Sequence, residues 1–310
     1  MVITIKNLVK RYGDLIALDH LNLEVREGEV FGLLGPNGSG KTTAINCLLS
    51  LLKYDKGEIS IYDQPMHPQA YDLKKRIGVV MQNVAVFDEL NVYENIDYFC
   101  GLYVSDKATR RQLVEEAMDF VGIRDFKKFP PKKLSGGLLR RLNIACGIAH
   151  KPDLIIMDEP TVAVDPQSRN SILEGIQKLN KNGATIIYTS HYMEEVEQIC
   201  SRIAIMDKGK VIASGSNESL KEIIKTGEHT SLEILNPEKL DLAEIADFPN
   251  IISADLIDSQ LLIKSSRGKN NLIPILDLLK NRDIQIGKVF SEPPTLNDVF
   301  LEITGKELRD

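Results

Sequence analysis

The sequence predicts an α/β fold, in which a mainly parallel core sheet is covered by helices and is followed by a small α+β domain. Two observations lead to this prediction. From residue 150 to about 216, short apolar segments alternate with segments of helical periodicity, which is typical of a parallel sheet. Near residue 40 a glycine-rich loop stands between a strand and a helix, as in a βα unit.

The first part of the chain contains three predicted strands and one helix. The strands are expected at 2–8, 17–25 and 28–35, and the helix at 42–52. The N-terminal run alternates and lacks the apolar core of a signal peptide. No run approaches the roughly 18 apolar residues that cross a bilayer, so we expect no membrane insertion by this chain itself.

Helical periodicity dominates the region from 88 to 150, and buried strands follow it. The predicted helices of this region span 94–103, 109–123 and 138–150. Beyond it, buried strands are expected at 153–160 and 184–191, with helices at 168–183 and 193–200. Residues 202–216 are typical of a hairpin that turns at Lys208-Gly209.

The pattern of predicted strands and helices changes after about residue 219. Strands are expected at 229–235, 253–258 and 260–266, and helices at 271–282 and 295–308. We therefore predict a first domain of residues 1–227, with a helical lobe at about 88–150, and a small accessory domain of residues 228–310.

Composition and charge indicate a globular protein and do not favour a nucleic-acid-binding one. The chain has 310 residues, of which 43% are hydrophobic and 26% charged, which suits two globular domains. A net charge of −6 does not favour nucleic acid as the main partner. The four cysteines are widely spaced, which predicts reduced, buried thiols rather than a metal site: Cys47, Cys100, Cys146 and Cys200.

The run GPNGSGKTT fits the phosphate-loop pattern G-x-x-x-x-G-K-[ST] completely. Glycines let the backbone wrap tightly, so that successive N–H groups point toward a phosphate. We expect Lys41 to reach the β- and γ-phosphates, Thr42 to ligate Mg²⁺ and Thr43 to contact the α-phosphate. The predicted nucleotide-binding residues are Gly35, Pro36, Asn37, Gly38, Ser39, Gly40, Lys41, Thr42 and Thr43.

The segment DLIIMDEP supplies two carboxylates at the end of a buried strand. A carboxylate beside a phosphate loop can hold Mg²⁺, and we assign this role to Asp158. Glu159 follows at once and would face the γ-phosphate, where a base can deprotonate water. The alternative is a strand that merely ends in two solvated acids, which the phosphate loop disfavours.

A second candidate anion site begins at LSGG, residues 134–137, where a predicted helix starts. Ser135 could be an ordinary helix N-cap, and that alternative is compatible with ligand binding. Taken with the phosphate loop, the acidic pair and a histidine after a further strand, LSGG makes the sequence resemble the ATP-binding subunit of an ABC transporter. The resemblance covers about residues 2–225 and includes five motifs in the family's order.

The resemblance implies the ABC type of P-loop NTPase fold, with an N-terminal antiparallel β region and a helical lobe beside the core sheet. It also implies a head-to-tail dimer, in which one subunit's phosphate loop and the other's LSGG hold each ATP. In that arrangement Ser135, Gly136 and Gly137 would clasp the γ-phosphate bound to the partner.

Four more residues match family motifs. By resemblance, Tyr12 stacks on adenine, Gln82 contacts Mg²⁺ or the attacking water, Asp165 crosses the dimer interface and His191 holds the γ-phosphate. Simpler alternatives are a half-buried strand aromatic, a polar strand end, a helix N-cap and an unremarkable histidine, respectively.

Two positions depart from the family pattern. Leu138 stands where the family usually has Gln, so a polar contact to the neighbouring ribose is expected to be missing. Ala163 stands where the family usually has Gly, and its Cβ restricts the backbone. Both departures put the rate of hydrolysis in doubt and leave the class of enzyme unchanged.

The resemblance implies an enzyme that hydrolyses Mg-ATP to ADP and phosphate and drives export through a separately encoded membrane permease. The apolar segment 84–99 would line the groove that receives the permease, unless its side chains form the core of the helical lobe. The segment 293–308 resembles the tail of bacterial drug, antibiotic and sodium exporters. We expect a homodimer, or a heterodimer with a related ATPase, at the cytoplasmic face of the membrane.

Two rival functions remain open from the sequence. One is a soluble ABC ATPase that acts on ribosomes or nucleic acid, although this chain has one ATP module and no room for a long insertion between Gln82 and Ser135. The other is a regulatory or immunity module that does not hydrolyse ATP. Glu159 and His191 argue against that module, whereas Leu138 keeps it open.

Overall fold

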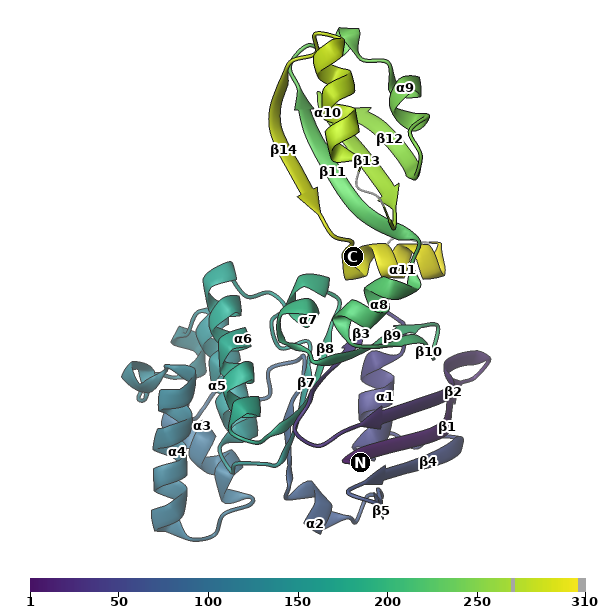
Figure 1. Cartoon of the computed structure of the whole chain (residues 1–310). Helices are drawn as coiled ribbons and strands as arrows, with labels where there is room; N and C mark the ends of the chain where they lie inside the picture. The colour runs from purple at the N-terminus through teal and green to yellow at the C-terminus, as the bar shows by residue number, and fades with distance from the viewer. Residues whose placement is uncertain (269–270, 306–310) are drawn as a thin grey trace. The chain divides into compact units, whose positions relative to one another are not determined.

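The computed structural model describes residues 1–268 and 271–305 (Figure 1). The chain divides into two compact units, of which the first is Met1–Ser216 and the second begins at Asn217. The sequence predicts the boundary after residue 227. The division falls earlier because helix α8 (Asn217–Ile223) packs against helix α11 (Leu296–Thr304) of the second unit.

The first unit contains two sheets. Its strands are β1 (Ile3–Tyr12), β2 (Leu15–Val25), β3 (Val30–Leu34), β4 (Lys56–Ile61), β5 (Gln64–Pro65), β6 (Ile77–Val80), β7 (Leu154–Asp158), β8 (Thr185–Ser190), β9 (Arg202–Asp207) and β10 (Lys210–Gly215). The smaller sheet is antiparallel and has the order β2-β1-β4-β5. The larger sheet has the order β10-β9-β3-β8-β7-β6, and only β10 pairs in the antiparallel sense.

The central strands of the larger sheet are apolar because both faces are covered. Every residue of β3, β7 and β8 is buried. Such strands read as continuous apolar runs rather than as alternating ones, which is why the sequence located them well. The predicted N-terminal antiparallel region is confirmed by the smaller sheet, and its buried face packs in one core with α1 (Lys41–Leu48).

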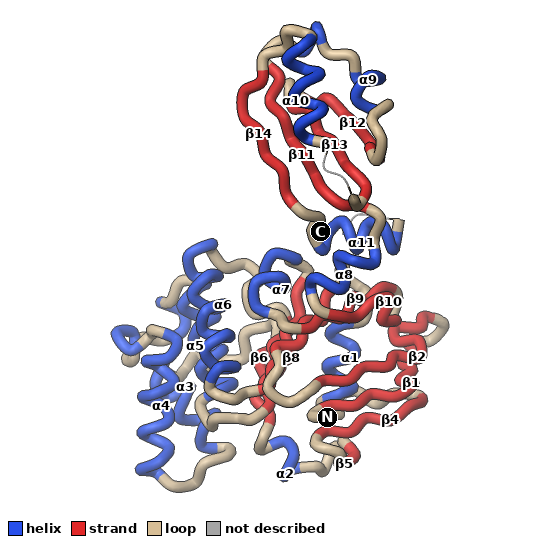
Figure 2. The backbone as a smooth tube through the Cα atoms, viewed as in Figure 1, coloured by secondary structure: helices blue, strands red, loops and turns tan. Residues whose placement is uncertain are grey.

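Three helices of the first unit form a separate lobe. The helices of this unit are α1, α2 (Tyr71–Lys74), α3 (Val92–Gly101), α4 (Lys107–Val121), α5 (Gly136–Ile148), α6 (Pro166–Lys181) and α7 (Met193–Ile199), with short 3-10 helices at Arg124–Phe126 and Pro131–Lys133. Figure 2 shows α3, α4 and α5 together in a helical lobe beside the strands. This lobe has its own core, which includes the fully buried Val92, Ile96 and Leu142.

Local signals account for where these helices begin and end. Asn91 and Glu94 form a capping box at the start of α3. The helix expected at 109–123 ends at Val121, because Gly122 adopts a left-handed conformation with φ of 67°. None of the helices among the described residues is both long and apolar enough to span a bilayer.

The second unit is a four-stranded antiparallel sheet with helices on one face. Its remaining elements are β11 (Thr226–Ile234), β12 (Ile251–Ile257), β13 (Gln260–Ser266), β14 (Ile286–Glu292), α9 (Leu242–Ala246), α10 (Leu272–Asn281) and a 3-10 helix at Pro237–Lys239. The sheet has the order β12-β13-β11-β14 and shares its core with α9 and α10. Strand β14 escaped the sequence analysis because all of its residues after Ile286 are exposed. The last predicted helix is present as α11, and the part expected at 306–308 lies outside the described residues.

The predicted fold class is confirmed, and so is the state of the cysteines. All four are free and buried. Burial raises the pKa of Cys47 and of Cys100 to about 11, which keeps both protonated at neutral pH.

Candidate nucleotide site

Four neighbouring strands of the core sheet lead to predicted site residues. Strand β3 runs into Gly35, β7 ends at Asp158, β8 ends just before His191 and β6 ends just before Gln82. Because these strands are parallel and adjacent, their carboxyl ends lie at one edge of the sheet. Ligands of open α/β sheets bind at this edge.

The phosphate loop has a shape that requires glycine and a polar interior. Gly40 has a φ of 106°, and a Cβ atom there would lie 2.7 Å from the carbonyl oxygen of Ala17. Ser39 is only 2% exposed, and its Oγ has no hydrogen-bond partner among the described residues. A buried hydroxyl without a partner normally requires an explanation, and a bound phosphate supplies one. The loop therefore fits the phosphates of a nucleotide.

Lys41 lies inside this loop with its ammonium group directed at acceptors. Its Nζ donates hydrogen bonds to the carbonyl oxygens of Gly35 at 2.7 Å and Pro36 at 3.2 Å, and lies 3.5 Å from Oε1 of Glu159. Burial lowers the pKa of Lys41, and the Glu159 carboxylate opposes that effect. A cation held in this way can meet the negative charge of phosphates.

Asp158 is fully buried, and both of its carboxylate oxygens accept hydrogen bonds from threonine. Thr42 Oγ1 donates to one oxygen at 3.0 Å, and Thr189 Oγ1 donates to the other at 2.6 Å. Within the part of the chain that the structure describes, no cluster of three or more His, Cys, Asp or Glu side chains could hold a metal. The family resemblance implies Thr42, Asp158 and Gln82 as the residues that would hold Mg²⁺, and their oxygens are the ligand type that Mg²⁺ prefers.

Glu159 is the point at which three separate motifs meet. Its Oε1 faces Lys41, while its Oε2 lies 3.2 Å from His191 Nδ1 and accepts a hydrogen bond from Gln82 Nε2 at 3.4 Å. Glu159 is 5% exposed and has a φ of 47°, a left-handed conformation that is costly for a residue with a Cβ. Strained backbone of this kind is concentrated at functional sites.

Comparison with known proteins shows the family of this chain. Residues 18–162 match the family model described as ABC transporter. A linearmycin resistance ATP-binding protein of Bacillus subtilis is 34% identical over 98% of this chain and 99% of its own length. A Nod factor export ATP-binding protein of Burkholderia orbicola is 33% identical over 99% of this chain and 98% of its own length.

The chain belongs to the ABC transporter family. The family predicted from the sequence motifs is thereby confirmed, together with its class of enzyme, an ATP hydrolase that serves an exporter-type transporter. A dimeric, post-hydrolysis ATP-binding cassette bound to ADP and phosphate has a similar structure, with a TM-score of 0.64 and 28% identity. That similarity covers 69% of this chain and 98% of the other, so it corresponds to a single cassette.

The LSGG residues of this ABC protein pack against a turn in the same chain. Ser135 Oγ accepts a hydrogen bond from Leu138 N at 3.3 Å and caps α5, as an ordinary N-cap does. A Cβ atom on Gly137 would lie 2.5 Å from Ser168 Oγ and 3.2 Å from Asp165 Oδ2. Asp165 in turn caps α6, since its Oδ1 accepts from Ser168 N at 2.9 Å. Ser135, Gly136 and Asp165 are all exposed, so they remain open to a partner.

Tyr12 ends strand β1 and is 49% exposed, with Lys10 Nζ 5.0 Å from its ring centre. Stacking on a base requires an exposed ring. The two departures from the family pattern also have local accounts. Leu138 packs against the core of the helical lobe. Ala163 has a φ of 60°, so a residue with a Cβ occupies a left-handed position that favours glycine.

Several residues that position the site were missed by the sequence analysis. Thr189 holds Asp158, and its Oγ1 also accepts from the backbone N–H of Glu159 at 3.0 Å. Arg140 donates to the carbonyl oxygen of Gln82 at 2.8 Å, and Asn143 donates to that of Met81 at 3.3 Å. Because side chains alternate between the two faces of a strand, the sequence could have indicated that Thr189 points to the opposite face from Tyr188 and Ser190. Only the order of strands in the sheet shows that it meets Asp158.

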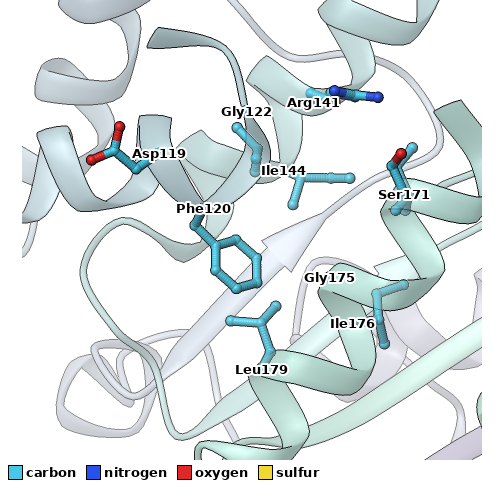
Figure 3. A pocket seen from close by; sticks show the side chains of 11 residues that line it. Asp119, Phe120, Gly122, Arg141, Ile144, Ser171, Gly175, Ile176 and Leu179 are labelled. Atoms are coloured by element: carbon cyan, nitrogen blue, oxygen red, sulfur yellow. The ribbon is translucent and has the colours of Figure 1, made fainter.

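The structure also contains pockets away from the predicted site. One of about 200 Å³ lies between α4, α5 and α6, where Phe120, Ile144 and Leu179 line it (Figure 3). A larger one of about 480 Å³ borders it and shares Phe120 and Leu179. Neither is lined by a predicted site residue, so the assignment of the nucleotide site depends on the loop and its contacts rather than on a cavity.

Proposed function

We propose that this ABC protein binds Mg-ATP at the phosphate loop, hydrolyses it with Glu159 as the general base, and drives export through a separate membrane permease. The observation that carries the proposal is the position of the Glu159 carboxylate, which lies within 3.5 Å of groups on Lys41, Gln82 and His191. A base beside a phosphate loop, surrounded by donors, is what attack by water on a γ-phosphate requires.

Each residue has a definite part in that reaction. Bound Mg²⁺ would neutralise phosphate oxygens, with Thr42, Gln82 and Asp158 as the residues that hold it. Glu159 accepts a proton from the attacking water, whose oxygen bonds to the γ-phosphorus as the bond to the bridging oxygen breaks, and ADP and phosphate result. Lys41 and the loop N–H groups stabilise the charge on the phosphate oxygens, and His191 donates to the γ-phosphate.

The second half of the ATP site comes from another copy of the chain or from a related ATPase. Ser135, Gly136 and Asp165 are exposed at helix N-termini, where backbone N–H groups and the helix dipole favour an anion. The similarity to a dimeric cassette supports this arrangement. ATP bound between two copies would close the dimer, and hydrolysis would release it.

The surface proposed to receive the permease contains two exposed aromatic side chains. Phe87 is 41% exposed and Tyr98 is 48% exposed, and their rings pack edge to face at 4.9 Å. Val92 and Ile96 of the same segment are fully buried, so only part of residues 84–99 is open to a partner. Relatives named for linearmycin resistance and for Nod factor export support the proposal of transport out of the cell, with this chain at the cytoplasmic face of the membrane.

The proposal is tested by the turnover of Mg-ATP and by the proteins that co-purify. Glu159→Gln is expected to lower turnover by about 10²–10⁴-fold while ATP binding persists, which is the usual contribution of a general base. Glu174→Gln, at an exposed position of α6, removes the same charge and should leave turnover unchanged. From solubilised membranes, the tagged chain should recover a multi-helix membrane protein in stoichiometric amount. Recovery with ribosomes alone would contradict the transport function.

A further inference from the structure

One buried carboxylate outside the phosphate site has an unusual number of partners. Glu195, on α7, is 3% exposed. Its Oε2 accepts hydrogen bonds from Tyr188 Oη at 2.6 Å, Thr161 Oγ1 at 2.8 Å and Ser190 Oγ at 2.9 Å. Its Oε1 lies 3.3 Å from Nε of Arg169. Burying a carboxylate is costly unless such partners surround it, so the packing of this region depends on all four.

The partners come from segments that carry site residues. Thr161 belongs to the turn that follows Glu159, and Ser190 directly precedes His191. Arg169 is in the first turns of α6, where its backbone N–H donates to the carbonyl oxygen of Asp165 at 2.9 Å. Glu195 therefore joins the segment of the general base, the segment of the histidine and the start of α6 through a single side chain.

The alternation of strand β8 separates this cluster from the reacting groups. Thr189 points to Asp158, whereas Tyr188 and Ser190 point to Glu195. Burial raises the pKa of Tyr188 well above its usual range, and the neighbouring Glu195 raises it further, so the phenol remains a donor. Glu195 acts through other residues and is not in contact with Glu159 or His191 in any interaction that the described residues show.

A second route leads from the cluster to the histidine. Ser190 Oγ accepts from the backbone N–H of Tyr192 at 2.9 Å. The guanidinium of Arg169 lies 4.8 Å from the centre of the Tyr192 ring, and this ring lies 4.1 Å from that of His191. Any change at Glu195 that moves Ser190 or Arg169 would therefore also move the ring next to His191.

We propose that Glu195 is a positioning residue for ATP hydrolysis, because it holds the turn after Glu159 and the segment of His191 in a single arrangement. This inference rests on the proposed function. Since a displacement of about 1 Å at a reacting group can cost about 10²-fold in rate, the residue should affect kcat. It should not affect ATP binding, because the phosphate loop and Tyr12 belong to other segments.

The test is Glu195→Gln in the full chain. The glutamine carbonyl can still accept from the hydroxyls, but its amide N–H₂ then faces the Nε–H donor of Arg169. We expect kcat to fall by about 10- to 100-fold with KM for ATP changed by less than about threefold, in line with a small misplacement of reacting groups. The neighbouring exposed Glu194→Gln removes the same charge from the same helix and should behave like the wild type.

A double variant separates positioning from a general effect on folding. In Glu195→Gln with Arg169→Gln, the residue at 169 offers an acceptor to the amide, so most of the lost kcat should return. Should Glu195→Gln fail to fold, Thr161→Val removes one donor with little change of shape, and kcat should fall without a change in KM.

The results distinguish the inference from the function on which it rests. An unchanged kcat in Glu195→Gln, or a loss in which KM and thermal stability change together and the double variant restores nothing, would overturn the positioning role. If the wild-type chain itself shows no turnover above that of Glu159→Gln, the proposed function fails instead.

Discussion

Ala163 offers a direct measurement of backbone strain in the turn between Glu159 and Asp165. Its φ of 60° and its exposed side chain mean that Ala163→Gly relieves a left-handed conformation without opening a cavity. The left-handed conformation costs about 1–2 kcal/mol. Glycine also lowers the free energy of unfolding by about 0.4–1 kcal/mol, because it increases the conformational entropy of the unfolded chain. The expected net effect is a stabilisation of about 0.5–1 kcal/mol.

Differential scanning calorimetry of the nucleotide-free chain measures this effect. For a unit of this size, the stabilisation corresponds to a rise in Tm of about 1–4 °C in the main transition. The matched control is Ala108→Gly, an exposed position in the first turn of α4 where no strain is relieved and glycine costs up to about 1 kcal/mol. The two variants should therefore shift Tm in opposite directions. A fall in Tm for Ala163→Gly as large as for Ala108→Gly would refute the strain argument.

Three further predictions concern the partner half-site, the permease surface and pH. Ser135→Arg should abolish turnover while leaving the ATP affinity of the monomer nearly unchanged. Ser135→Ala controls for loss of the helix cap. A large loss of ATP affinity in the monomer would mean that Ser135 acts within its own chain. Phe87→Ser with Tyr98→Ser should prevent co-purification of the proposed permease and preserve ATP turnover. The control Tyr71→Ser, at a position 66% exposed, should leave both co-purification and turnover unchanged. His150 stacks on Tyr103 at 4.0 Å, and burial lowers the pKa of His150, although the carbonyl oxygen of Ile77 opposes this. Free histidine titrates at about pH 6.5, so just below that pH His150 binds a proton in the unfolded chain more readily than in the folded one. The free energy of unfolding is therefore highest above that pH and decreases as the pH falls. His150→Phe should reduce the loss of Tm between pH 7 and pH 5, and an unchanged loss would contradict this.

Sequence reasoning was strongest where a motif is continuous along the chain. The phosphate loop is one run of residues whose strand and helix follow from local pattern, and all of these appear in the structure. Asp158 and Glu159 were located in the same way, since β7 is a continuous apolar run that ends at the acidic pair. The conformation of Ala163 was not predicted, because a left-handed φ in a residue other than glycine has no clear local signal.

Boundaries and exposed elements were harder to predict. Helix α8 was assigned to the first domain because its sequence does not show that it packs against α11. Strand β14 is held beside β11 by backbone pairing, and nearly all of its side chains are exposed. Its sequence therefore does not need the apolar alternation by which a strand is predicted. Both misses have the same cause, which is that long-range contacts are not encoded in local periodicity.

The sequence by itself determined the family, the phosphate loop and the identity of the acidic pair, because each depends on residue type at a fixed short spacing. Only the tertiary structure decided which groups meet. The order β3-β8-β7-β6 brings Gln82 and His191 to Glu159, although they are far apart in the chain. The same order turns Thr189 toward Asp158, and the packing of α6 and α7 encloses Glu195. Strand order and burial arise from the packing of the whole sheet, which no short segment contains.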